Sequence, residues 1–203
     1  SSVSPSELMT VSDWLNQPNK SQKKYLDTEA VYRQFVYENY QTVDQGLEKT
    51  IAHLFDQDEF ENTGIYSISQ HIRDTLTKNA YQKEKTNTQS ENVLEDFLNQ
   101  KISGNDVLFA SAAVEAFRHY NIPARYVEGY LLKSDAIDEE GNATLTSKDG
   151  HAWVEVYFDG MGWLPIDVTP GYYYDVYTLM NMVATPQEDN SQVNIEKGHK
   201  DSQ

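Results

Sequence analysis

The sequence contains no cysteine, and this absence excludes several kinds of chemistry. Without thiols the chain can form no disulfide, build no thiolate metal site and use no cysteine nucleophile. It also lacks any run of about 18 or more apolar residues, the length that a membrane-spanning helix requires. Its first residues carry neither the basic stretch nor the apolar stretch of a signal peptide. We therefore expect any contact with a membrane to come from segments outside this sequence.

Basic residues are scarce as well. Sixteen Lys and Arg residues stand against 32 Asp and Glu residues, so the formal net charge is -16. This charge repels phosphate backbones and anionic lipid headgroups at long range, and we predict no nucleic-acid partner. We interpret the charge as the solvated surface of an extracytoplasmic, cell-surface domain. A cationic ligand, such as a Lys-rich peptide, is the alternative interpretation.

Apolar residues recur at spacings of three and four in the first hundred residues, a pattern typical of amphipathic helices. Residues 16–24 are polar and contain a proline, so we expect a break there. Asp27 and Thr28 are of the residue types that cap a helix N-terminus. The expected helices cover residues 4–15, a stretch that begins at Asp27 and Thr28, 47–54, 66–79 and 93–98.

From Ala124 onward the pattern changes to aromatic and β-branched runs separated by turn residues, which predicts an antiparallel sheet. The expected strands lie within residues 124–132, 151–158 and 162–168. Helices followed by strands indicate the α+β class. The predicted organisation is a helical N-terminal extension or lobe at 1–80, a core at 81–180 and a polar tail or linker at 181–203.

Three separated stretches carry residues that chemistry could use. Asp106 precedes an Ala-rich helix, His151 opens a strand, and Asp167 follows on the next strand. A carboxylate beside an imidazole on neighbouring strands can fix its tautomer, as the third member of a nucleophile–base–orienter triad does. A helix N-terminus carries partial positive charge, which would activate a thiol placed there.

The motifs DFLNQKISGNDVLFASAAVEAFRHYNIPARYVEGY and HAWVEVYFDGMGWLPIDVTPGY together closely resemble the bacterial transglutaminase-like superfamily, relatives of the papain-like thiol enzymes. The resemblance covers roughly residues 81–172. It implies a transglutaminase-like, papain-like core with helices packed on an antiparallel sheet, and it aligns the family's nucleophilic Cys with Asp106. The implied triad is therefore Asp106, His151 and Asp167. Asn121 stands where the family usually has Gly, which predicts a left-handed backbone at that position.

The substitution removes the thiol but not the charge pattern of the site. A carboxylate is a poor nucleophile toward an amide, so we expect no transglutaminase or thiol-protease activity. An Asp106 carboxylate beside a His151 imidazolium reproduces the charges of a thiolate–imidazolium pair, and a helix N-terminus tolerates it. The sequence therefore predicts a non-catalytic module of a Gram-positive-type bacterium. In this interpretation the old substrate cleft binds a peptide, protein or cell-wall ligand, without cofactor or metal.

Other interpretations stay open. The first is a hydrolase or acyltransferase that uses Asp106, His151 and Asp167 on an amide or ester, with or without a divalent metal held by these side chains. The second is that Asp106 is only a helix cap, His151 an ordinary strand histidine and Asp167 a residue that bonds local backbone. For an oxyanion donor the candidates are Tyr81 and the backbone N–H of residue 106.

Overall fold

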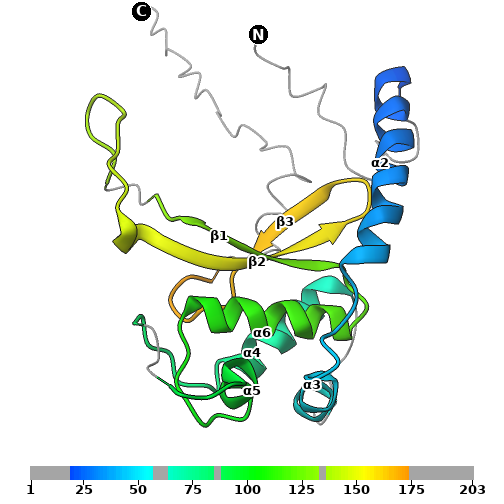
Figure 1. The fold of residues 1–203 in the computed structure, drawn as a ribbon. Coiled ribbons are helices and arrows are strands. Elements are labelled where there is room, and N and C mark those ends of the chain that lie inside the picture. Colours follow the sequence, from blue (N-terminus) through cyan, green and yellow to red (C-terminus); the bar gives the residue numbers. More distant parts are fainter. Residues whose placement is uncertain (1–18, 57–63, 85–87, 133–135, 174–203) are drawn as a thin grey trace, which may run out of the picture.

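The computed structural model combines helices with one antiparallel sheet, as the α+β prediction requires (Figure 1). It describes residues 19–56, 64–84, 88–132 and 136–173. The helices are α2 (Lys20–Asn39), α3 (Glu48–Phe55), α4 (Ile65–Leu76), α5 (Val93–Leu98) and α6 (Asp106–His119). The strands are β1 (Ala124–Tyr130), β2 (Gly150–Phe158) and β3 (Gly162–Ile166), in the order β1-β2-β3.

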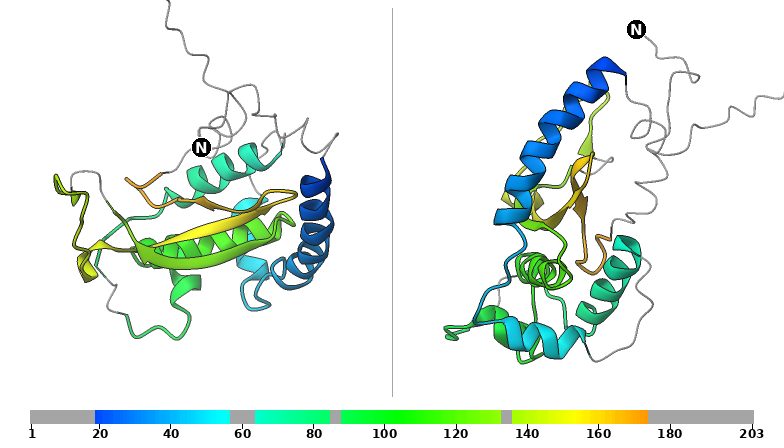
Figure 2. Two further views of the ribbon diagram at one scale, coloured as in Figure 1. Left: turned by 90° about the horizontal axis from the view of Figure 1, so that it is seen from above. Right: turned by 90° about the vertical axis from the view of Figure 1, so that its right-hand side faces the viewer.

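Helix α6 packs lengthwise against one face of the sheet (Figures 1 and 2). Its alanines make this close approach possible, because small side chains let a helix backbone lie near a sheet. Ala112, Ala113 and Ala116 are fully buried, and Val154 and Val156 of β2 are fully buried as well. The helix therefore fixes its own N-terminus relative to the strands, which matters for the site described below.

The hydrophobic core extends across residue 80. Ile51 of α3 and Ile72 of α4 belong to the same buried cluster as Phe109, Phe117 and the strand valines. The division of the chain at residue 80 stays a prediction about domain organisation, but α3 and α4 share the core of the later segments. The predicted tail at 181–203 lies outside the described residues.

Helix α2 stands at the end of the sheet where β2 turns into β3 (Figure 2). Buried Glu29 accepts hydrogen bonds from the Tyr157 hydroxyl at 2.7 Å and from the Gly160 N–H at 3.0 Å. The Trp163 indole N–H donates to the Tyr32 hydroxyl at 2.9 Å. These contacts join α2 to the sheet through one side of the helix only.

The predicted start of this helix at Asp27 and Thr28 is wrong, and residues 20–24, which were expected within a break, are helical. Residues 16–18 of that expected break lie outside the described residues. The helix begins at Lys20, and Asn19 caps it by accepting from the backbone N–H groups of Ser21 and Gln22. The Gln22 side chain returns a bond to the Asn19 N–H. This reciprocal capping box satisfies the free backbone N–H groups of the first turn, so the helix N-cap lies eight residues before the predicted one at Asp27.

The remaining elements lie close to their predicted positions, with differences at their ends. Helix α4 ends at Leu76, before Asn79, and β3 ends at Ile166, so Asp167 lies just after the strand and not on it. Asn121 has φ 58°, which confirms the predicted left-handed backbone. The helix expected at 4–15 lies outside the described residues. Among the helices that are described, none combines the length and apolar character needed to cross a bilayer.

Candidate functional site

The segment that delivers Asp106 is held on both sides. Gly104 pairs with Tyr81 in a parallel bridge, with the Gln82 N–H donating to the Gly104 carbonyl at 2.8 Å. A side chain at residue 104 would overlap the Phe97 ring, so glycine is required there. Asn105 caps α6 by accepting from the Leu108 N–H at 3.3 Å. Asp106 is thus fixed as the first residue of α6.

Three distant side chains meet at this helix end. His151 Nδ1 lies 3.1 Å from Asp106 Oδ2, and His151 Nε2 lies 2.5 Å from Asp167 Oδ2. The Ala152 N–H donates to the same Asp106 Oδ2 at 2.9 Å, and the Thr169 N–H donates to Asp167 Oδ1 at 2.9 Å. His151 and Asp167 are buried, with 6% and 5% of their surface exposed. The imidazole is therefore clamped between two carboxylates.

The electrostatics of this clamp favour the charged forms of His151 and Asp106. Burial by itself would lower the pKa of His151, but hydrogen bonds to Asp106 and Asp167 and their charges raise it to about 9. Burial would raise the pKa of Asp106, but the bonds from His151 and from the Ala152 N–H, with the charge of His151, hold it below its usual range. At neutral pH both ring nitrogens carry protons, so the imidazolium has no free lone pair to accept another.

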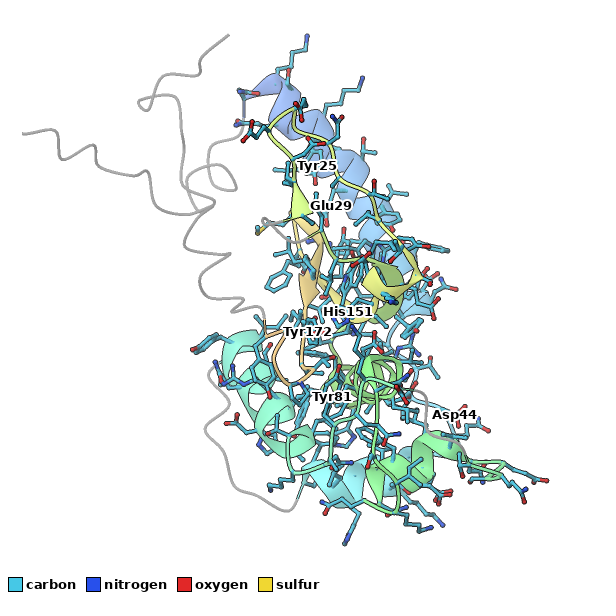
Figure 3. The ribbon with its side chains drawn as sticks, turned by 90° about the vertical axis from the view of Figure 1, so that its left-hand side faces the viewer. Tyr25, Glu29, Asp44, Tyr81, His151 and Tyr172 are labelled. Atoms are coloured by element: carbon cyan, nitrogen blue, oxygen red, sulfur yellow. The ribbon has the colours of Figure 1, made fainter. Side chains whose placement is uncertain are left out.

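Aromatic rings cover the imidazolium. The Tyr172 ring lies 4.5 Å from the His151 ring, centroid to centroid, and the Trp153 ring lies 6.3 Å away in a stacked arrangement. Burial and a side-chain hydrogen bond with Tyr172 raise the pKa of Tyr81 to about 12. In Figure 3, Tyr172 lies beside His151 with Tyr81 below them. The hydroxyl of Tyr81, one candidate for an oxyanion donor, is thus paired with Tyr172.

Tyr172 was not singled out from the sequence as a site residue. It follows Asp167 by five positions, and its N–H donates to the Thr169 carbonyl at 3.0 Å in a turn that contains Gly171 with φ 87°. This turn brings the Tyr172 ring back over His151. The sequence feature that could have indicated Tyr172 as a site residue is its place at the end of the TPGY stretch, directly after the motif that contains Asp167.

The Trp153 indole lies across Gly129 on the neighbouring strand. These strands pair so that His151 is opposite Gly129, and a Cβ on Gly129 would come within 2.6 Å of the indole. The indole Nε1 is buried and makes no hydrogen bond within the described part of the chain. Glycine at position 129 therefore allows the indole to lie flat beside the site.

A pocket of about 520 Å³ opens beside the clamp. This volume lies in the range of small-molecule and peptide side-chain sites. The charged side chains in its wall are Asp106, His151 and Glu128, and the Tyr126 hydroxyl donates to Glu128 at 2.5 Å. The full lining consists of Asp106, Val107, Glu128, Gly129, Tyr130, Ser147, Gly150, His151 and Ala152.

A metal ion would have to compete with the clamp. Zinc and related ions bind a neutral imidazole nitrogen, and both His151 nitrogens face carboxylates. Within the described ranges, no three His, Asp or Glu side chains are grouped so that they could hold a metal ion. Metal binding by His151 would therefore require the ring to release Asp106 or Asp167.

The three side chains thus form an acid–imidazole–acid arrangement, with Asp106 at the N-terminus of α6, His151 on β2 and Asp167 directly after β3. A family model described as "Transglutaminase-like superfamily" matches residues 49–168, more than half of the chain. The chain belongs to the transglutaminase-like superfamily, and it is a member without cysteine. The match begins in the α3 region, earlier than the resemblance recognised from the motifs.

Two curated relatives share substantial identity. The "Uncharacterized protein YebA" of Bacillus subtilis is 32% identical over 133 residues, which covers 61% of this chain. A "Protein-glutamine gamma-glutamyltransferase" of Pseudomonas aeruginosa is 38% identical over 77 residues, which covers 37% of this chain. The chain spans only 17% and 11% of the lengths of these two relatives.

Solved structures resemble the fold at lower identity. The periplasmic domain of TgpA from Pseudomonas aeruginosa bound to ethylmercury aligns with a TM-score of 0.48 and 23% identity, over 66% of this chain and 48% of that chain. A putative cysteine protease from Cytophaga hutchinsonii aligns with a TM-score of 0.41 and 21% identity, over 64% of this chain and 41% of that chain.

Proposed function

We propose that this transglutaminase-like domain does not catalyse acyl transfer and instead binds a peptide, protein or cell-wall ligand in the pocket beside Asp106. One observation carries the proposal: the residue at the nucleophile position is a carboxylate that forms a buried ion pair with His151. Asp106, His151 and Asp167 are, in this proposal, a degenerate triad that has become part of the wall of a binding site.

The ion pair leaves the site without two groups that acyl transfer requires, an effective nucleophile and a general base. Attack by Asp106 on an amide would form an anhydride from a weak nucleophile, and its Oδ2 already accepts two hydrogen bonds. A general base must offer a lone pair at the working pH, whereas His151 with a pKa of about 9 holds both protons at neutral pH. The same two facts weigh against the alternative of a hydrolase that uses Asp106, His151 and Asp167.

The proposal includes a place of action outside the membrane of a Gram-positive-type bacterium. The identity to a Bacillus subtilis protein over 61% of the chain supports the bacterial group. The excess of acidic residues supports a solvated extracytoplasmic surface. Any membrane contact would be made through segments that this sequence does not contain.

Ligand binding in the pocket is expected to change the fluorescence of Trp153, because the indole lies over Gly129 and beside His151, two residues of the pocket wall. We expect a saturable change on titration with soluble peptidoglycan fragments or with a Gln- and Lys-containing peptide. Micromolar to millimolar affinity corresponds to about 4 to 8 kcal/mol, which suits a pocket of this size. The measurement is steady-state emission at increasing probe concentration.

Two variants make the titration specific. Trp153→Phe should lose most of the signal, while isothermal calorimetry still reports binding of the probe. Glu128→Gln changes the charge of the pocket wall without touching the clamp, and should alter the affinity. A flat titration with both probes would contradict the binding role. Turnover of either probe by the native chain that disappears in His151→Ala would establish an enzyme instead.

A further inference from the structure

Strand β1 has one side that no other strand covers in the described part of the chain, because the sheet order is β1-β2-β3. In an antiparallel pair, alternate residues direct their N–H and C=O groups toward the partner strand. The Pro123 carbonyl and the Leu131 N–H, one residue outside each end of β1, both bond across to the chain of β2, at 3.0 Å and 2.8 Å. Odd-numbered residues of β1 therefore face β2, and even-numbered residues direct their backbone groups outward.

This outer edge is closed at the start of the strand and open further along. The Ala124 N–H donates to the Tyr40 carbonyl at 3.0 Å, and the Ala124 carbonyl accepts from the Arg118 side chain at 3.0 Å and 3.1 Å. The outward-facing residues that follow are Tyr126, Glu128 and Tyr130. Their backbone N–H and C=O groups make no hydrogen bond to any residue that the structure describes. Such an edge can pair with another strand.

The open part of the edge borders the pocket beside Asp106. Glu128 and Tyr130 belong both to this edge and to the pocket wall, and Tyr130 is 60% exposed. The Glu128 carboxylate accepts a hydrogen bond from the Tyr126 hydroxyl, and among the described residues it has no Lys, Arg or His partner. A ligand that lies along the edge would therefore meet free backbone groups and an unneutralised carboxylate together.

We propose that the ligand of this pocket is an extended peptide that pairs as an added strand with residues 126–130 of β1 and carries a basic side chain into the pocket. This inference rests on the proposed binding function and names the class of its ligand. Alternate residues of the peptide would exchange N–H and C=O bonds with the outer edge of β1. Successive side chains of a strand point to opposite faces, so every second side chain would face the pocket, where a Lys or Arg would pair with Glu128. A glycan chain has no such alternation of backbone donors and acceptors.

Backbone methylation of the peptide tests the strand pairing. The probes are the Gln- and Lys-containing peptide and two analogues, each methylated at every second backbone nitrogen, one for each of the two sets of alternate residues. Only one set can direct its N–H groups toward β1. One analogue should therefore bind the full chain at least about tenfold more weakly than the parent peptide, and the other within about threefold, as read from Trp153 fluorescence. Equal affinities of the two analogues would overturn the inference.

Two variants at Tyr126 test the same edge from the side of the protein. Tyr126→Pro removes an outward N–H without removing a bond to β2, and proline is tolerated at such edge positions. Tyr126→Ala loses the same side chain but keeps the N–H. We expect Tyr126→Pro to bind the parent peptide about tenfold more weakly than Tyr126→Ala, with circular dichroism showing that both are folded. The same affinity in both variants would contradict strand pairing. If Tyr126→Pro does not fold, the methylated peptides decide the question, because they leave the protein unchanged.

The titrations also separate this inference from the function on which it rests. Saturable binding of soluble peptidoglycan fragments without binding of the peptide would support the pocket as a binding site and overturn the peptide inference. No saturable binding of either probe would contradict the binding function, and the inference with it. Replacing the Lys of the peptide by norleucine should weaken binding about tenfold, and an unchanged affinity would overturn the predicted pairing with Glu128.

Discussion

Replacing Asp106 by Cys is expected to create a thiol that reacts with iodoacetamide on the order of 10- to 100-fold faster at pH 6 than an ordinary exposed cysteine. The reason is that the α6 N-terminus and the His151 imidazolium, which now stabilise a carboxylate, would stabilise a thiolate in the same place. The thiol pKa should therefore fall well below its usual value of about 8.5. The measurement is the pH dependence of the alkylation rate, followed by mass spectrometry.

Two comparisons define the source of the reactivity. Gln34→Cys provides an exposed thiol on α2, away from the site, and should react as a free thiol. Asp106→Cys combined with His151→Ala should lose most of the enhancement, because the imidazolium is gone. If the Asp106→Cys thiol titrates near 8.5 and reacts no faster than the Gln34→Cys thiol, the charge pattern of a thiol site is not preserved. Acyl transfer to an amine by the single variant would extend the result to catalysis.

Replacing His151 by Ala is expected to lower the free energy of unfolding by about 3 to 5 kcal/mol at pH 6, because the buried Asp167 and the partly buried Asp106 would lose the cation between them. Asp167 is 5% exposed and the Asp106 side chain is 18% exposed, so water cannot fully replace the imidazolium. Urea unfolding followed by circular dichroism measures this difference. Removing one carboxylate as well, in Asp106→Asn with His151→Ala, should restore part of the lost stability.

The pH dependence of this effect follows from the pKa values. The His151 pKa is raised above its unfolded value of about 6.5, so the ion pair stabilises the fold fully below pH 6.5 and loses this contribution as the pH rises through about 9. The cost of His151→Ala should therefore shrink as the pH rises through about 9 toward pH 10. His119→Ala, which breaks an exposed pair with Asp56, should cost less than about 1 kcal/mol at any pH. A cost for His151→Ala as small as that would contradict a buried ion pair.

Much of the site could be predicted because Asp106 and His151 lie on regular elements and Asp167 directly follows one. The α6 pattern, the alternation in β2 and the tight turn before β3 together fix where Asp106, His151 and Asp167 fall relative to one another. The contact between His151 and Asp167, sixteen positions apart, is observed as the strand pairing led us to expect. Their role in function stays a prediction, because contact alone does not show what the residues do.

The features that were missed depend on geometry that local patterns do not contain. Tyr172 reaches His151 only because a turn at Gly171 reverses the chain, and the sequence does not specify that direction. The start of α2 was misplaced because Asn19 and Gln22 form a reciprocal cap within a stretch that is polar throughout. The shared core of α3, α4 and the strands is a long-range packing effect, which separate helical patterns cannot reveal.

The most direct test of the ion pair is an NMR titration of the His151 imidazole with ¹⁵N-labelled protein, assigned by comparison with His151→Ala. The structure predicts a doubly protonated ring at pH 7, with a pKa of about 9 that falls when Asp106 is replaced by Asn. A ring with one bare nitrogen at pH 7.5 and a pKa near the ordinary value of about 6.5 would contradict it. Such a ring would again be available as a general base.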